Sequence, residues 1–250
     1  MNESTTAVVG KVAKITLLFW LMKIVATTLG ETLGDFLSQT LGWGYTVGIA
    51  LTLVFFVLVL CVQLAMRTYV PVVYWLVVIG TTTLGTEISD YIDRTLHLGY
   101  AAGSLLLVGG LLLSLYLWYR KYGNLAVYPV VERPKELYYW TAILFSNSLG
   151  TAFGDFLGDY FGLSYLYGAL ITGLVIFVVA IAHRFQKVNP IVLFWLAFIF
   201  TRPFGATFGD FLTKPISSGG LDLGTLHASL ASVGVMAVLL WVAHRKFGRS

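Results

Sequence analysis

Charged residues are scarce in this chain. Only 11% of its 250 residues are charged and 58% are hydrophobic, whereas soluble domains carry about 25% charged residues. The shortage argues against an ordinary water-soluble domain. Apolar runs at residues 45–65, 101–118 and 163–182 approach the roughly 20 residues that a helix needs to cross a bilayer. We therefore expect a polytopic membrane protein.

Metal-binding thiols and imidazoles are also few. The single cysteine, Cys61, excludes an intramolecular disulfide and a thiolate cluster within one chain. His97, His183, His227 and His244 are scattered, so a histidine-rich zinc site is not expected. No phosphate-cradling loop, nucleotide fingerprint or hydrolytic Ser/His/Asp set can be recognised. We expect neither an enzyme nor a cofactor beyond a bound divalent cation.

One element occurs four times. Copies of a Gly-rich motif ending in Asp and an aromatic residue stand at 30–37, 85–91, 150–157 and 205–212. A tryptophan lies fifteen residues before each motif aspartate; the pairs are Trp20 and Asp35, Trp75 and Asp90, Trp140 and Asp155, and Trp195 and Asp210. A fixed spacing repeated four times indicates a four-fold internal repeat.

Each repeat predicts two membrane-spanning helices. The expected helices cover residues 14–40, 45–67, 69–94, 98–120, 137–161, 165–185, 190–213 and 226–247. The first apolar run contains Lys23 and the first motif, which favours a spanning helix over a cleavable signal peptide. The expected organisation is a tail (1–13), repeats 1 and 2 (14–120), a linker (121–136) and repeats 3 and 4 (137–250). We predict an all-α bundle of eight transmembrane helices.

Two spans per repeat make every motif helix cross the membrane in the same direction. The repeats are then parallel, with pseudo-four-fold symmetry or a two-fold arrangement of pairs. Twelve of the sixteen basic residues fall near the N-terminus or after the even-numbered helices. The positive-inside rule therefore places both termini in the cytoplasm. The pI of about 9.1 reflects this topology, helped by anionic lipid, and no nucleic-acid partner is expected.

The motif carboxylates predict a cation site. Each motif aspartate lies about twenty residues, or roughly 30 Å, along its helix, near the outer hydrocarbon boundary. Acidic side chains in a membrane normally face an interior or a wet cavity. The expected cation ligands are Asp35, Asp90, Asp155, Asp210, Glu31 and Glu87. The expected polar pathway comprises Thr27, Thr82, Thr86, Asn147, Thr151, Asp159, Lys23 and Arg202.

The same features also have structural interpretations. The small-xxx-small glycine pairs let neighbouring helices approach closely, and the repeated tryptophan favours helix packing. The aspartates could cap their helices or bond the next loop. However, like charges gathered at one end of a bundle repel unless something positive sits among them. Most polar side chains of the predicted helices offer oxygen ligands, which favour Mg²⁺, Mn²⁺, Ca²⁺ or protons over Cu⁺.

Arg202 breaks the four-fold pattern. It lies about twelve residues, roughly 18 Å, along its helix, and the aligned positions are Thr27, Thr82 and Asn147. A buried guanidinium needs a carboxylate partner, for which Glu31 and Glu87 are candidates by depth. Arg202 is either a fixed ion pair holding the bundle together or a counter-cation that gives way when an ion arrives.

The repeats resemble a known family. Four tandem two-helix units, each with a Trp and a Gly-xxx-Gly-Asp-Phe element, are similar over residues 14–247 to a bacterial family of membrane proteins described by a repeat of unknown function. Repeat 2 departs from the pattern with Ser89 and Tyr91. The resemblance implies a bacterial inner-membrane location and no settled activity. A looser similarity to cation/proton exchangers with paired Glu-x-Gly-Asp elements is an analogy only, because Glu31 stands four residues before Asp35.

These features together favour a transporter or channel for an inorganic cation, with a divalent ion such as Mn²⁺ or Mg²⁺ preferred. The expected partners are that cation or protons, and the lipid bilayer. The alternative is a non-transporting scaffold or sensor in which the carboxylates lock helix packing. A bound ion or a water-filled axial path separates the two hypotheses.

Overall fold

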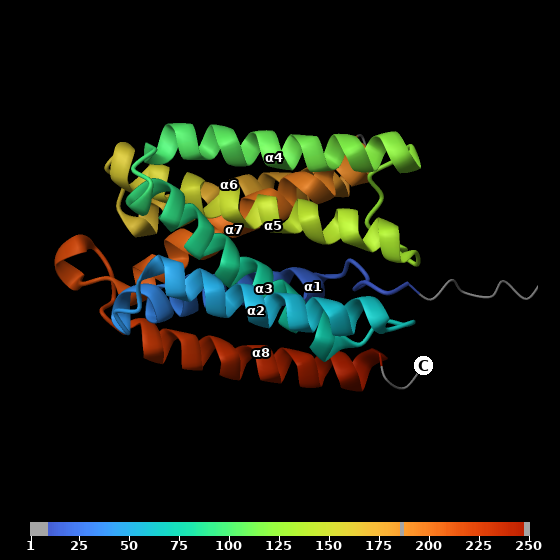
Figure 1. Ribbon diagram of the computed structural model, residues 1–250, viewed down its shortest axis with the longest axis horizontal. Helices are drawn as coiled ribbons and strands as arrows, with labels where there is room; N and C mark the ends of the chain where they lie inside the picture. The colour runs from blue at the N-terminus through green and yellow to red at the C-terminus, as the bar shows by residue number, and fades with distance from the viewer. Residues whose placement is uncertain (1–9, 186–187, 248–250) are drawn as a thin grey trace, which may run out of the picture.

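The computed structural model describes residues 10–185 and 188–247, without the side chains of 159, 246 and 247, and this part of the chain is all helical (Figure 1). Eight long helices run alongside one another: α1 (Leu17–Asp35), α2 (Gly44–Ala65), α3 (Pro71–Asp90), α4 (Gly99–Tyr122), α5 (Arg133–Asp155), α6 (Tyr165–Arg184), α7 (Pro190–Thr213) and α8 (Thr225–Phe247). The predicted all-α architecture of eight helices is confirmed. Helix α5 begins four residues earlier than expected, because Pro134 occupies its first turn, where a missing N–H has no consequence.

The motif helices form a closed inner ring. Helix α1 contacts α3 and α7, and α5 contacts the same two helices from the other side. Helices α2, α4, α6 and α8 pack outside on α3, α5, α7 and α1, so each outer helix covers the motif helix of the next repeat. In their most apolar stretches, α1, α3 and α7 have 61–72% of residues buried, against 22–28% in the four outer helices. The outer helices therefore provide the lipid-facing surface.

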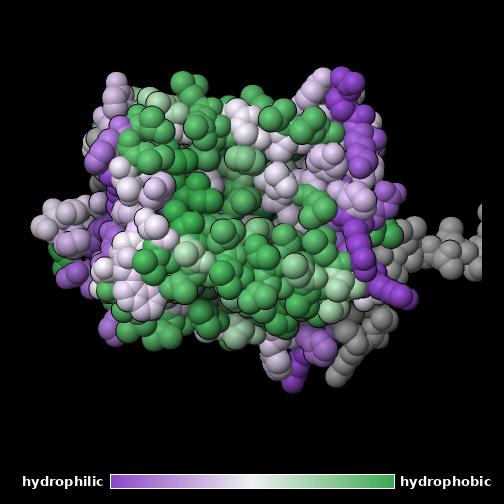
Figure 2. Space-filling model, in the orientation of Figure 1, coloured by the Kyte–Doolittle hydropathy of each residue, from purple (hydrophilic) through white to green (hydrophobic). Residues whose placement is uncertain are grey.

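The face of the bundle in Figure 2 shows an apolar band between two polar ends. Seven of the eight helices are long and apolar enough to cross a membrane. The exception, α5, belongs to the inner ring and lies between α3, α4 and α7, and its Ser146, Asn147 and Ser148 are buried. The chain is a multi-pass membrane protein. We call the end that holds residues 10 and 247 the terminal end, and the opposite end, which holds the motif aspartates, the carboxylate end.

Glycines close the ring by one repeated contact. A Cβ added at Gly30 would lie 2.4 Å from the Thr82 Cβ, and one at Gly205 would lie 2.5 Å from the Thr27 Cβ. The first glycines of the other two motifs meet the aligned positions of the next helix, Asn147 and Arg202. The first glycine of each motif thus lets the backbones of two neighbouring motif helices come into close contact.

The motif helices end in two ways at the carboxylate end. After Asp35, Asp90 and Asp155 the helix widens into a five-residue π-helical turn, at Phe36–Thr40, Tyr91–Thr95 and Phe156–Tyr160. The fourth copy differs, because α7 continues to Thr213 and a loop with a 3₁₀ turn at Ile216–Ser218 follows. Backbone bonds from Asp222 to Lys214 and from Leu221 to Phe211 fold this loop back on the helix. One residue of this loop, Lys214, enters the carboxylate cluster described below.

Aromatic side chains fill the ring near the terminal end. The aromatic residue before each repeated tryptophan is buried; these residues are Phe19, Tyr74, Tyr139 and Phe194. The Tyr74 and Tyr139 hydroxyls lie 2.5 Å apart, and the Phe19 and Phe194 rings are 6.4 Å apart. Trp75, Trp140 and Trp195 are buried among them, whereas Trp20 is half-buried. The expectation that the tryptophans pack between helices is correct.

Candidate functional site: a carboxylate cluster

The four motif aspartates gather at one end of the inner ring. Each stands at the end of the α-helical part of its motif helix or within its last turn, and all four are buried, with exposed fractions of 2–8%. The four helices run in the same direction, so their last turns meet at one level. Buried acidic residues are rare in membrane proteins and mark functional sites.

Lys214 bridges two of the aspartates. Its Nζ lies 2.8 Å from Asp35 Oδ2 and 3.2 Å from Asp210 Oδ1. Gln39 donates a further bond of 2.5 Å to Asp35 Oδ1. Burial by itself would lower the pKa of Lys214, but Asp210 and Asp35 outweigh it and raise that pKa well above its usual range. The ammonium therefore stays positively charged between the two carboxylates.

Arg94 stands between the other two aspartates at a longer distance. Its Nη2 is 3.9 Å from Asp90 Oδ1 and 3.8 Å from Asp155 Oδ2, and its Nη1 donates to the Tyr45 hydroxyl at 3.0 Å. At that separation neither carboxylate receives a hydrogen bond from Arg94. Asp90 Oδ1 and Asp155 Oδ2 are buried oxygens that lack a hydrogen-bond partner among the described residues. This side of the cluster has unused ligand oxygens.

Three carboxylates come close enough to share one ion. Oxygen atoms of Glu31, Asp35 and Asp210 lie within 4.8 Å of one another. A cavity of about 320 Å³ opens beside them and is lined by Arg94, Gly154, Asp155, Gly158, Tyr165, Asp210 and Lys214. All-oxygen ligand sets of this kind suit hard divalent cations.

Arg202 lies below the aspartates, in the middle of the ring. Its Nη2 pairs with Glu31 Oε2 at 2.9 Å and also contacts the Thr86 hydroxyl. Thr86 belongs to α3, which stands opposite α7 in the ring, so the arginine crosses the bundle axis. Of the two carboxylates expected as its partner, Glu31 is the one it meets. The Nε and Nη1 atoms have no hydrogen-bond partner among the described residues.

Lys23 crosses the axis along the other diagonal. Its Nζ donates to Asn147 Oδ1 at 2.9 Å and lies 4.0 Å from the centre of the Phe198 ring. Asn147 in turn donates to the Thr81 hydroxyl at 3.0 Å. Lys23, Asn147 and Arg202 therefore lie in the interior of the ring, where they obstruct its axis.

Other predicted site residues lie elsewhere. Glu87 faces outward between α3 and α2, where its Oε2 bonds the Thr52 hydroxyl, and it is not among the three carboxylates that approach one another. The hydroxyls of Thr27, Thr82 and Thr151 bond main-chain carbonyls within or between helices. The side chain of Asp159 lies outside the described residues. Glu87 therefore belongs to a helix interface, because its position on α3 points it toward α2 rather than the axis.

The two cationic residues that lie beside the motif aspartates were not predicted from the sequence. Arg94 and Lys214 each stand four residues after a motif aspartate, a spacing that puts both side chains on one face of a helix. The aligned residue in repeat 1 is Gln39, which also bonds its aspartate. Comparing this position across the repeats would have found both cations.

Comparisons with known proteins agree with the repeat architecture. The family model described as "Repeat of Unknown Function (DUF347)" matches four segments, residues 18–69, 73–123, 138–189 and 193–247. No curated protein and no solved structure matches the chain significantly. The four matched segments correspond to the four two-helix units of the bundle and cover most of the chain. The chain belongs to the DUF347 repeat family, of which it carries four tandem copies.

Proposed function

We propose that this protein is a transporter or channel for a divalent inorganic cation of the Mn²⁺ or Mg²⁺ type. In this proposal the carboxylate end faces outward from the bacterial inner membrane and the terminal end faces the cytoplasm. The cation binds at the carboxylate cluster, defined as Glu31 and the four motif aspartates. The role is one of binding and translocation, without a catalytic step.

The charge balance of the cluster carries this proposal. Among the described side chains, the five buried carboxylates of the cluster form ion pairs with three cationic side chains, Arg94, Lys214 and Arg202. When all are ionised, two negative charges remain in excess. Uncompensated buried charge is costly in a medium of low dielectric constant. One divalent cation neutralises this excess, and the unpartnered oxygens of Asp90 and Asp155 provide ligands for it.

Lys214 and Arg94 act as tethered cations in this scheme. They neutralise part of the cluster before an ion arrives and move aside as it binds. Lys214 is suited to this role because its flexible side chain, 24% exposed, reaches the cluster from the edge of the bundle. An ammonium and a metal ion compete for the same oxygens, so the lysine lowers the apparent affinity of the cluster for the metal ion.

The middle of the ring has to rearrange during transport. Arg202 and Lys23 cross the axis, and the aromatic residues around Tyr74 and Tyr139 pack the ring beyond them. A cation passing Arg202 meets a positive charge unless the guanidinium leaves Glu31 and Thr86 and moves away from the axis. This favours a carrier that changes conformation over a permanently open channel.

Transport into proteoliposomes tests the proposal. Mn²⁺ entry is followed with an enclosed Mn²⁺-sensitive dye in wild type and in Asp35→Asn, Asp90→Asn, Asp155→Asn and Asp210→Asn. Each variant should lose more than tenfold in apparent affinity, which is about 1.4 kcal/mol. Asp222→Asn is the matched control, because Asp222 is exposed in the outer loop and has φ +56°, a conformation that asparagine tolerates well. Wild-type protein that gives no Mn²⁺ or Mg²⁺ flux above empty liposomes would rule the proposal out.

A scaffold or sensor is the second candidate, and one observation favours it. Every motif aspartate lies within ion-pair distance of Arg94 or Lys214, so the cluster could simply hold the carboxylate end together. In that case the Asp→Asn variants lose thermal stability and their response to divalent ions stays unchanged. Melting curves recorded with and without Mn²⁺ on the same variants separate the two functions.

A further inference from the structure

The terminal end contains a second buried charge cluster. Residues 10–13 precede α1 without helical structure, yet all four are buried. The Lys11 ammonium, 2% exposed, forms an ion pair with Glu136 Oε2 and donates to the Leu64 carbonyl at 3.2 Å. The Lys11 main-chain N–H donates to the Val130 carbonyl at 2.7 Å. The segment is thus fastened between α2, α5 and the linker.

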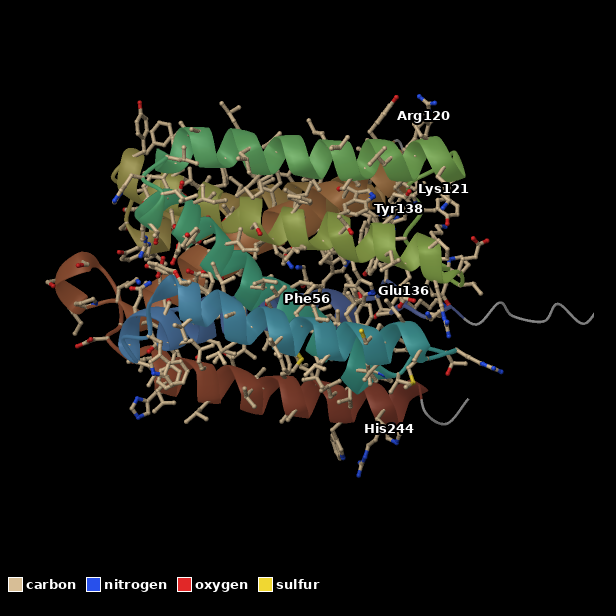
Figure 3. All side chains as sticks on the ribbon, in the orientation of Figure 1. Phe56, Arg120, Lys121, Glu136, Tyr138 and His244 are labelled. Carbon is tan, nitrogen blue, oxygen red and sulfur yellow. The ribbon has the colours of Figure 1, made fainter. Side chains whose placement is uncertain are left out.

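Gln63 completes the surroundings of this lysine. Its Nε2 donates to Glu136 Oε1 at 2.7 Å and to the Lys11 carbonyl at 3.0 Å. Its Oε1 is buried and has no hydrogen-bond partner among the described residues. Glu136 is fully buried, and Figure 3 shows it inside the bundle where the N-terminal segment enters, whereas Arg120 and Lys121 project from the surface of the same end. The Lys11 ammonium therefore contacts one Glu136 oxygen and the Leu64 carbonyl oxygen, and the second Glu136 oxygen and the Gln63 amide, whose Oε1 is unpartnered, adjoin them.

This arrangement matches the other end of the bundle in its chemistry. At both ends a lysine ammonium is held by buried oxygen ligands, with Lys214 on Asp35 and Asp210 and with Lys11 on Glu136. Glu136 also borders the aromatic residues that pack the ring, since Trp140 Nε1 lies 3.4 Å from Glu136 Oε1. An unpartnered amide oxygen suits a metal ion, which takes more ligands than the three donors of an ammonium can engage.

We propose that Glu136, Gln63 and the Leu64 carbonyl form a second divalent-cation site at the terminal end, which the Lys11 ammonium occupies as a plug. A cation binding there displaces Lys11 and releases residues 10–13 from the bundle. The proposal deepens the proposed function and rests on it for the class of ligand. Because Glu136 and the motif aspartates lie at opposite ends, the two sites can be tested separately.

Cysteine accessibility measures displacement of the plug without changing Lys11. Ala13→Cys is made in a Cys61→Ser background, because Ala13 is only 4% exposed whereas Cys61 is exposed. Maleimide labelling of the full chain in detergent is timed with and without Mn²⁺. Mn²⁺ should accelerate labelling at least tenfold, and adding Glu136→Gln should abolish the acceleration. Lys14→Cys, at an exposed position, should label at one rate throughout.

Removing the ammonium gives the second arm. Lys11→Gln should label fast at position 13 without Mn²⁺, and its Glu136 site should bind Mn²⁺ at least tenfold more tightly than that of Lys14→Gln in equilibrium dialysis. An unchanged labelling rate with Mn²⁺ in the Ala13→Cys protein would overturn the proposal. Fast labelling of Lys11→Gln without tighter Mn²⁺ binding would also overturn it, since Lys11 would then only fasten residues 10–13 to the bundle.

A double variant of the carboxylate cluster, Asp35→Asn/Asp210→Asn, separates this inference from the proposed function. In Asp35→Asn/Asp210→Asn the Mn²⁺-dependent labelling at position 13 should persist. If that variant and wild type both fail to transport while labelling still responds to Mn²⁺, the Glu136 site is supported and the transport function is refuted. If labelling still responds to Mn²⁺ in wild type but not in this double variant, Mn²⁺ acts through the carboxylate cluster and the Glu136 site is refuted.

Discussion

Arg202 and Glu31 form a buried ion pair between neighbouring helices of the inner ring. The Nη2 to Oε2 distance is 2.9 Å, and the two side chains are 0% and 5% exposed. The pair joins α7 to α1, and the contact of Arg202 with Thr86 adds α3. Three of the four inner helices therefore meet at one guanidinium, at the level where the carboxylate cluster ends.

Neutralising Arg202 should destabilise the protein. Arg202→Gln leaves Glu31 buried without its cation, and breaking a buried pair from one side costs about 3–5 kcal/mol. The double variant Arg202→Gln/Glu31→Gln should recover most of this loss, because no uncompensated charge remains. Thermal unfolding in detergent measures both changes.

The same variants test whether the arginine is also a counter-cation. If Arg202 gives way to an arriving ion, Arg202→Gln should bind Mn²⁺ more tightly and turn over more slowly. If the pair is purely structural, affinity should not rise. A stable Arg202→Gln protein with unchanged binding and transport would refute both roles.

Removing the Lys214 ammonium should raise cation affinity. Lys214→Gln frees Asp35 and Asp210 from a competing positive charge, so Mn²⁺ should bind at least tenfold more tightly, about 1.4 kcal/mol. Lys121→Gln is the control, since Lys121 is exposed at the terminal end. Weaker Mn²⁺ binding in Lys214→Gln would mean that the lysine positions the carboxylates instead of competing for them.

Adding a methyl group to a glycine between the inner helices should destabilise the protein. The new Cβ in Gly205→Ala would lie 2.8 Å from the Thr27 carbonyl carbon, so the helices must separate, at a cost of about 1–3 kcal/mol. Gly234→Ala is the matched control, because its Cβ would meet nothing within 4 Å and alanine favours helix by about 0.5–1 kcal/mol. Equal melting temperatures of the two variants would contradict close packing of α1 and α7.

The orientation of the bundle is testable by labelling in intact cells. Single cysteines at positions 42, 97 and 219 should react with an impermeant maleimide from outside, whereas cysteines at 67 and 121 should react only after the membrane is opened. The background must lack Cys61, which is exposed. Labelling at position 67 from outside would reverse the assignment.

Much of the fold could be predicted from the sequence. The fifteen-residue spacing between tryptophan and aspartate recurs in every repeat, and low charge with long apolar runs leaves few structures other than membrane helices. These features are local and periodic, so they can be read along the chain. They predicted the eight helices, the four repeats and the clustering of the motif aspartates, all of which the structure contains.

The partners that the aspartates take from other repeats could not be predicted in the same way. Lys214 reaches Asp35 across 179 positions of sequence, and Arg94 reaches Asp155 from another repeat. Glu87 was expected beside the aspartates, but a rotation of about 100° per residue along a helix turns it toward Thr52 on α2. Depth along a helix follows from counting residues, whereas direction depends on which neighbour the helix packs against.

The sequence by itself determined the membrane-helix architecture, the repeat and the residue types available to a cation, because periodicity and hydropathy are properties of consecutive residues. Only the tertiary structure decided which charges meet. It closed the inner ring in the order α1, α3, α5, α7, brought Lys214 and Arg94 among the aspartates, and placed Lys11 on Glu136 at the other end. Ion pairs act over a few ångströms, and only the packing of helices brings residues of different repeats within that range.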